Sequence, residues 1–113
     1  MVYGDGSQSR DFDYAEDLCE GIRRGLEVDR TEIIQLGTGQ STTVNALIDT
    51  IRPIVGEARV SVRHEPFRPG EVIHTYCDIS KARRILDYDP STALDEGLRS
   101  SWTWFVDNAS RSA

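Results

Sequence analysis

Two arginines lie beside glycine-containing runs that suit the binding of phosphate. Arg10 follows the run GDGSQS at residues 4–9, and Arg68 begins the run RPGE at residues 68–71. The planar guanidinium of arginine matches two phosphate oxygens at once, and flanking glycines let the backbone approach a ligand closely. The two side chains are therefore predicted to hold a diphosphate between them. The alternative is that each forms an exposed ion pair with a neighbouring carboxylate, worth at most about 1 kcal/mol.

A third run of interest is GTGQST at residues 37–42, between an expected strand and an expected helix. Amide groups in such a turn can bind a phosphate at the start of the helix, as they do in dinucleotide-binding proteins. Thr42 stands where the dinucleotide motif has its third glycine, and no acidic residue follows at the distance that a ribose contact needs. An ordinary tight turn is therefore favoured over a dinucleotide site.

The other reactive side chains do not form a catalytic or metal-binding pattern. His64 and His74 have no cysteine or carboxylate at the spacing of metal ligands. The serines lack the context of a nucleophile elbow, and neither cysteine lies in a catalytic signature. We therefore assign no catalytic residue and no metal ligand in this sequence.

The composition indicates a soluble, folded and acidic chain. Its 113 residues fit a single domain, expected over residues 1–108 with a frayed tail at 109–113. The formal net charge of −6 repels nucleic acid and anionic lipid, so an anionic ligand must be bound locally. The sequence has no apolar stretch long enough to cross a bilayer and no signal-peptide pattern, so a cytoplasmic location is expected. Cys19 and Cys77 are expected to be reduced.

The hydrophobic periodicity predicts an α+β fold with about four helices and a few short strands. Helices are expected to begin near Ala15, Thr42, Asp78 and Thr92, and extended segments are expected at residues 1–3, 10–12, 31–36, 59–64 and 72–76. Asp78 is a good cap for the third helix, and Gly56 is expected to close the second.

The first helix and the segment after it carry the strongest apolar patterns. The helix has a stripe at 3.6-residue spacing that is expected to face the core, made of Ala15, Leu18, Cys19, Ile22 and Leu26. Asp13 or a neighbouring residue is expected to cap its start. The isoleucine pair in residues 31–36 predicts a buried strand there.

Five runs then occur in a characteristic order and spacing. They are VYGDG at 2–6, RDFDYAED at 10–17, LGTG at 36–39, RPGE at 68–71 and DISKA at 78–82. Together they resemble the C-terminal, substrate-binding region of extended short-chain dehydrogenases/reductases, in particular NAD-dependent nucleotide-sugar epimerases and dehydratases. The order of the runs covers nearly the whole chain and is far more specific than any one motif. The resemblance implies the C-terminal part of an extended Rossmann-type epimerase without its dinucleotide-binding domain.

The resemblance also implies a nucleotide-sugar site made by four residues. At the positions of Arg10 and Arg68 the family contacts the diphosphate, and at the position of Glu71 it bonds the ribose hydroxyls. Tyr3 and its backbone neighbours would lie along the nucleobase. These roles suit the side chains, because two cations match two phosphates and a carboxylate accepts hydrogen bonds from hydroxyls. The base is left open, so UDP-, dTDP- and GDP-sugars all remain candidate ligands.

The chain departs from that family in what it lacks. It has no complete glycine-rich dinucleotide loop and no Tyr-x-x-x-Lys pair, which the family uses for proton transfer beside the nicotinamide. Gln35 stands where relatives commonly have asparagine. The chain alone is therefore expected to bind no cofactor and to be inactive, either as an excised piece or as the product of a truncated gene. Whether the parent enzyme epimerises, dehydrates or decarboxylates its substrate stays open.

Two other functions stay open as well. One is a free-standing interaction or self-association module, which would use the surface that the Rossmann domain covers in the family and would form a homodimer. The other is a stand-alone sugar-nucleotide binder.

Overall fold

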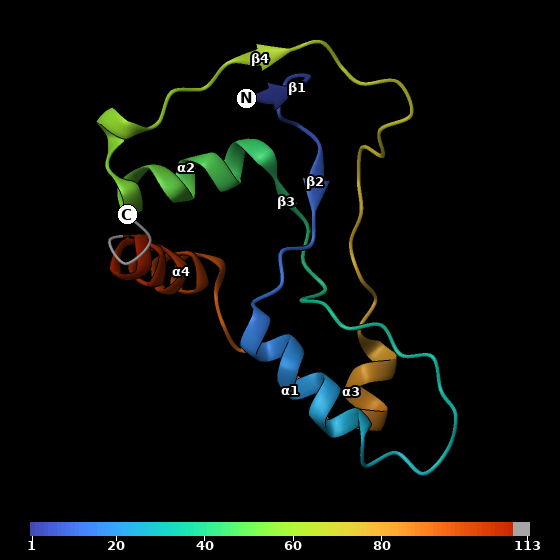
Figure 1. The fold of residues 1–113 in the computed structure, drawn as a ribbon. Coiled ribbons are helices and arrows are strands. Elements are labelled where there is room, and N and C mark those ends of the chain that lie inside the picture. Colours follow the sequence, from blue (N-terminus) through green and yellow to red (C-terminus); the bar gives the residue numbers. More distant parts are fainter. Residues whose placement is uncertain (110–113) are drawn as a thin grey trace.

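The computed structural model describes residues 1–109, in which long extended segments join four α-helices (Figure 1). The helices are α1 (Ala15–Gly25), α2 (Val44–Val55), α3 (Ser80–Leu86) and α4 (Leu94–Ala109), and a 3₁₀ turn, η1, spans Glu57–Arg59. The strands are β1 (Val2–Tyr3), β2 (Ser9–Arg10), β3 (Thr42–Thr43) and β4 (His64–Glu65). The predicted α+β class and the expected number of helices are confirmed.

The helices form two pairs. α2 packs against α4, and α1 packs against α3 (Figure 1). The described chain measures 50 × 39 × 22 Å and has a radius of gyration of 16.8 Å, whereas a compact domain of this length would have about 13 Å. The chain is therefore flat and open, and much of its apolar surface faces outward.

The strands form two short ladders that hold distant segments together. β1 pairs in parallel with β4, and β2 pairs antiparallel to β3. A further parallel bridge joins Ser9 to His74. The strand expected at residues 10–12 lies one residue earlier, in β2, and the strand expected at residues 59–64 is reduced to β4 because η1 occupies its start. These ladders bring the two ends of the predicted binding site side by side.

The small core lies around α3. Its buried apolar side chains are Ile79, Ala82, Leu86 and Tyr88, and the partly buried Val28, Ile34, Leu36, Cys77 and Ile85 pack against them. The Asp78 carboxylate accepts a hydrogen bond from the Ser80 amide at 2.9 Å. The residue before the first turn of α3 is Ile79, however, and it makes no side-chain capping bond, so the expected cap at Asp78 lies one position too early. Cys77 and Cys19 are both free thiols.

The apolar stripe of α1 faces away from this core, contrary to the prediction. Leu18, Ile22 and Leu26 are 36%, 55% and 82% exposed. The buried residue of this helix is Gly21, where an added Cβ would lie 2.9 Å from the Leu36 side chain. The helix therefore makes its close contact through a glycine, and the side chains of its apolar stripe are left largely uncovered by the described chain.

Two further expectations about this region are wrong. Asp13 does not cap α1, because Tyr14 is the residue before the first turn and makes no side-chain capping bond. The strand expected at residues 31–36 does not form, because no neighbouring strand within residues 1–109 completes its hydrogen bonds. Ile33 is consequently 86% exposed, while Ile34 reaches the core.

The second pair of helices begins and ends much as the sequence indicates. The Thr43 hydroxyl accepts a hydrogen bond from the Ala46 amide at the start of α2. Pro53 lies inside the helix without ending it, and Gly56 closes it with φ at 96°. α4 continues through Ala109, the first residue of the predicted tail, and residues 110–113 lie outside the described chain. Within residues 1–109, no helix has both the length and the apolar character needed to span a membrane.

Candidate functional site

The N-terminal segment and the segment after β4 run side by side, although they are far apart in the sequence (Figure 1). The Val2 amide donates to the Arg63 carbonyl, and the Gly4 amide donates to the Glu65 carbonyl, both at 2.8 Å. Further along, the backbone of Ser9 pairs with the neighbouring segment at 2.8 and 3.2 Å. We call residues 1–10 and 63–75 the strip: their backbones are bonded at both ends, and Arg68 and Glu71 lie in the loop between the bonded ends. All four predicted site residues belong to this strip.

Arg10 is held in a defined orientation on this strip. Its Nη1 donates to the Ser9 carbonyl at 2.7 Å and to the Ile73 carbonyl at 3.3 Å. Its Nη2 lies 3.9 Å from Glu71 Oε1, and both side chains are only partly exposed, at 33% and 25%. The alternating directions of strand side chains point Arg10 to the face opposite its neighbour Asp11. The carboxylate partner of Arg10 is therefore Glu71, which sequence distance alone does not reveal.

Glu71 has an unused acceptor. Its Oε2 atom is buried and has no hydrogen-bond partner within residues 1–109. A buried oxygen without a donor carries a free-energy cost of about 1–3 kcal/mol. A ligand hydroxyl that donates to this oxygen would remove that cost.

Arg68 has a different environment from Arg10. Its guanidinium carbon lies 3.6 Å from the centroid of the Tyr3 ring, a cation–π contact. The Arg68 side chain has no hydrogen bond or ion pair with another residue of the described chain. The alternative prediction, an exposed ion pair with a neighbouring carboxylate, is therefore wrong for Arg68 within residues 1–109. The strip thus contains two guanidinium groups, one of them without a polar partner within residues 1–109, and a carboxylate with a buried oxygen that has no donor.

The turn at residues 37–39 binds a carboxylate of the chain itself. The Thr38 and Gly39 amides donate to the Asp11 carboxylate at 3.0 and 2.9 Å, and the Thr38 hydroxyl donates to it as well. The Cys77 amide donates to the same group at 3.2 Å. The Thr38 and Gly39 amides are therefore engaged within the chain.

Asp11 is therefore a structural centre that the sequence interpretation missed. Burial raises the pKa of its carboxyl, but the hydrogen bonds from Thr38, Cys77 and Gly39 together outweigh burial, and the pKa lies below its ordinary value. The signal available in the sequence was its place directly after Arg10 in an extended segment. Such neighbours point to opposite faces, so Asp11 belongs under the site and Arg10 belongs in it.

Ser9 is a second residue that the sequence did not single out. It is 4% exposed, and its Oγ accepts a hydrogen bond from the Ser41 hydroxyl at 2.7 Å. The same Oγ lies 2.9 Å from His74 Nδ1. Ser9 thus ties three chain segments together next to Arg10. Among residues 1–109, no group of three or more His, Cys, Asp or Glu side chains is arranged to hold a metal ion.

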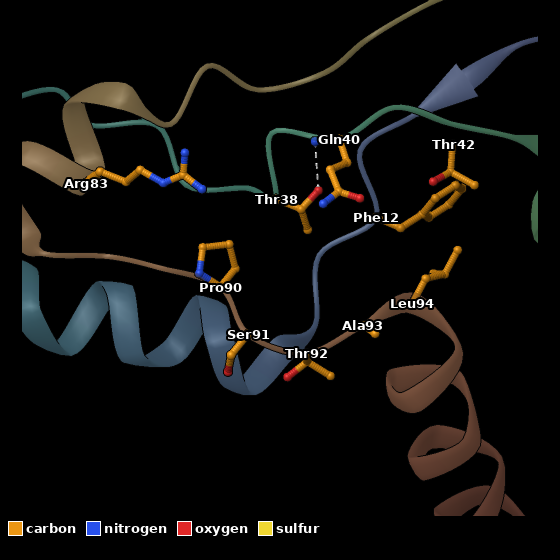
Figure 2. A pocket seen from close by; sticks show the side chains of 10 residues that line it. All are labelled: Phe12, Thr38, Gln40, Thr42, Arg83, Pro90, Ser91, Thr92, Ala93 and Leu94. Atoms are coloured by element: carbon orange, nitrogen blue, oxygen red, sulfur yellow. Dashed lines mark hydrogen bonds between the residues drawn. The ribbon is translucent and has the colours of Figure 1, made fainter.

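A polar cavity of about 300 Å³ lies elsewhere, between the 37–42 turn and the start of α4 (Figure 2). Its lining includes Thr38, Gln40, Thr92 and Arg83, and it contains none of the four predicted site residues. Arg83 supplies its charged group, and this guanidinium is paired with Asp89 at 3.4 Å. The charged group of this cavity is therefore already engaged in an ion pair.

Several known proteins are similar to this chain. The family model of GDP-mannose 4,6-dehydratase matches residues 1–101. The UDP-glucuronate 4-epimerase of Thermodesulfobacterium geofontis is 32% identical over 108 residues, which are 95% of this chain and 33% of that protein.

Solved structures agree with this likeness. The UDP-glucose 4-epimerase of Thermotoga maritima, crystallised with UDP-glucose, matches with a TM-score of 0.87 at 30% identity over 96% of this chain and 35% of its own. The UDP-glucuronic acid 4-epimerase of Bacillus cereus, in complex with UDP-glucuronic acid and NAD, matches with a TM-score of 0.78 at 30% identity over 94% and 34%. The chain spans about a third of the length of these relatives.

Proposed function

Because this chain belongs to the NAD-dependent nucleotide-sugar epimerases and dehydratases of the extended short-chain dehydrogenase/reductase family, we propose that it is the nucleotide-sugar-binding portion of such an enzyme. The observation that carries the proposal is the placement of Arg10, Arg68 and Glu71 on one strip, where Glu71 lies 3.9 Å from Arg10 and Arg68 lies over the Tyr3 ring. Relatives of similar fold are described with UDP-glucose and with UDP-glucuronic acid, which contain a diphosphate and a ribose.

In this proposal each side chain of the strip binds one part of the ligand. The guanidinium groups of Arg10 and Arg68 bind the diphosphate, because a charged, planar donor pair matches phosphate oxygens. The free Oε2 of Glu71 accepts a hydrogen bond from a ribose hydroxyl. The backbone around Tyr3 lies beside the nucleobase. The binding free energy obtained along the strip then positions the sugar for reaction.

The residues of this chain do not fit NAD. The amides of the 37–39 turn, the best candidate for a dinucleotide phosphate, are bonded to Asp11. None of the four tyrosines in the sequence has a lysine four positions later. NAD would supply a hydride acceptor when bound by another portion of the enzyme. We therefore infer that this chain binds substrate and that turnover depends on a dinucleotide-binding portion.

The exposed stripe of α1 is the surface that we assign to that portion. Leu18, Ile22 and Leu26 project from it, and Ile33 is exposed in the segment that forms no strand. Covering a leucine or isoleucine side chain stabilises a complex by about 1.5–3 kcal/mol for full burial. Residues 31–36 have unpaired backbone groups that a strand of the partner would complete.

A second candidate function, self-association, is favoured by one feature of α4. Trp104, Phe105 and Val106 are 68%, 54% and 47% exposed, next to one another on this helix. Sedimentation of the chain at low micromolar concentration separates the two functions. A dimer that binds no nucleotide supports self-association, and a monomer that binds nucleotide supports the first proposal.

The test of nucleotide binding is a titration with UDP-glucose, dTDP-glucose and GDP-mannose. Replacing Arg10 or Arg68 by alanine should weaken binding about tenfold or more, because a hydrogen bond to a charged group contributes about 1.5–3 kcal/mol. Arg99→Ala is the matched control, since Arg99 is exposed on α4 and its side chain has no polar partner within residues 1–109. Failure of all three ligands to bind, or equal affinity of the three variants, would contradict the proposal.

A further inference from the structure

Arg68 lies over an aromatic ring and not against an acceptor. Its guanidinium carbon is 3.6 Å from the centroid of the Tyr3 ring, which is close to van der Waals separation. Arg10, by contrast, is already bonded to two carbonyl groups and faces Glu71. A guanidinium that stacks on a ring uses its face, so the N–H groups at its edge stay available for an anion. The ring therefore holds Arg68 without consuming its donors.

A second contact anchors the loop that carries Arg68 to the same end of β1. Gly4 has φ at +76°, and an added Cβ there would lie 2.2 Å from Phe67 Cε2. The Phe67 ring thus packs directly on the backbone of Gly4, in a space that only glycine leaves open. The hydrogen bond between the Gly4 amide and the Glu65 carbonyl fixes this approach at 2.8 Å. The position of Arg68 over Tyr3 follows from this adjoining contact.

The contact with the Tyr3 ring matters because the rest of the loop does little to restrict the conformation of the Arg68 side chain. Arg68, Pro69 and Gly70 are all exposed. Ordering a long side chain costs up to about 2 kcal/mol of conformational free energy. A side chain that is ordered before the ligand arrives no longer incurs this cost during binding, so the affinity rises.

We propose that the Tyr3 ring is a positioning element for Arg68, and that it raises affinity for the diphosphate through Arg68 and not by stacking on the nucleobase. This inference rests on the proposed binding of a nucleotide sugar. It also revises the role that the family resemblance implies for Tyr3. One face of the ring is covered by Arg68, so that face is not available to the base.

The test is a double-mutant cycle of Tyr3→Leu and Arg68→Ala, with UDP as the ligand and nuclear magnetic resonance titration as the measurement. Tyr3→Leu should weaken UDP binding about two- to fivefold when Arg68 is present. The same change should have no effect once Arg68 is alanine, because the two residues act as one unit. Tyr3→Phe keeps the ring and should recover most of the lost affinity. Uridine, which has no phosphate, should bind the Tyr3→Leu variant as well as it binds the unaltered chain.

The outcomes separate this inference from the proposed function. If Tyr3→Leu weakens UDP binding equally in both backgrounds, the ring contacts the base directly and the inference is wrong. If the unaltered chain binds no UDP, the proposed function fails and the inference fails with it. Circular dichroism of each variant reports whether it is folded. If Tyr3→Leu is unfolded, Tyr3→Met takes its place in the cycle, because methionine fills irregular space without a ring.

Discussion

Asp11→Asn tests the view that the carboxylate beneath the site organises the chain around it. Asp11 accepts hydrogen bonds from the Thr38 amide and hydroxyl on one oxygen, and from the Gly39 and Cys77 amides on the other. Asparagine keeps the shape of the side chain but has one oxygen and one NH₂ group. Whichever way the amide is turned, two donors of the chain then face an NH₂ group that cannot accept their hydrogen bonds.

The size of the effect follows from these contacts. A hydrogen bond to a charged acceptor contributes about 1.5–3 kcal/mol, so loss of two such bonds costs at most about 3–6 kcal/mol. The Gly39 bond is exposed and the Cys77 bond is partly buried, so water will satisfy part of the loss. We expect the free energy of unfolding to fall by about 3 kcal/mol. For a chain with so small a core, this is a large part of the total stability.

The measurement is urea unfolding of the unaltered chain and the variant, followed by circular dichroism at several pH values. The pKa of Asp11 is lowered in the folded chain, so its stabilisation is present above the ordinary carboxyl pKa of 3.8 and is lost as the pH falls through the lower, folded value. The difference between the two proteins should therefore be full at neutral pH and shrink below about pH 4.

Asp49→Asn is the matched control for this change. Asp49 is exposed on α2, and its side chain has no polar partner within residues 1–109. This substitution should alter the free energy of unfolding by less than about 0.5 kcal/mol. A loss for Asp11→Asn as small as that of the control, or a loss that does not change with pH, would refute the reasoning.

Three further predictions concern packing and charge. Gly21→Val should destabilise the chain by about 1–3 kcal/mol, because an added Cβ would lie within 2.9–3.0 Å of the Leu36 and Tyr88 side chains. At Gly25 an added Cβ would meet nothing within 4 Å, so Gly25→Ala should stabilise the chain by up to about 1 kcal/mol. Urea unfolding midpoints measure both changes. Leu26→Gln, on the exposed stripe of α1, should change the free energy of unfolding by less than about 0.5 kcal/mol. Leu86→Ala, in the core, should lower it by about 2–5 kcal/mol. Equal shifts of the melting temperature for the two variants would show that the stripe is covered. Burial raises the pKa of Asp13, and two neighbouring carboxylates add to the shift, so its stabilisation is full below pH 3.8 and is lost as the pH rises through the folded value. Asp13→Asn should therefore gain stability relative to the unaltered chain between pH 3 and pH 7, as measured by thermal melts. A difference in stability that does not change with pH would contradict this prediction.

The sequence predicted structure well where a short segment contains its own partners. The apolar spacing of residues 79–86 led to the correct helix and to the core around Ala82, and Asp78 accepts a hydrogen bond from the Ser80 amide at the start of that helix. The helix that ends at Gly56 was likewise foreseeable from local signals. In these cases the residues that define the element and the residues that stabilise it are neighbours in the chain.

Predictions from the sequence failed where the surface that covers a helix, or the strand that pairs with a segment, is not a neighbour in the chain. Apolar periodicity shows that Leu18, Ile22 and Leu26 share a face of α1, but it does not identify the surface that covers the face. The segment at residues 31–36 has a strand-like composition, yet a strand needs a neighbour to pair with. Both features depend on a covering or pairing surface that residues 1–109 do not supply.

The candidate site was predictable only in part. The ordered motifs singled out Tyr3, Arg10, Arg68 and Glu71, and the fold places all four on one strip. The Arg68–Tyr3 contact and the unpaired oxygen of Glu71 depend on how two remote segments lie together, so spacing along the chain does not contain them.

The exposed aromatics of α4 have a spectroscopic consequence. Both tryptophans of the sequence, Trp102 and Trp104, lie on this helix, which is separated in Figure 1 from the segment that follows β4. Intrinsic tryptophan fluorescence therefore reports the α2–α4 end of the molecule and is blind to direct contacts at Arg10 and Arg68. A change in tryptophan emission during a titration signals a rearrangement or an association of α4. Ligand binding to the strip has to be followed through Tyr3.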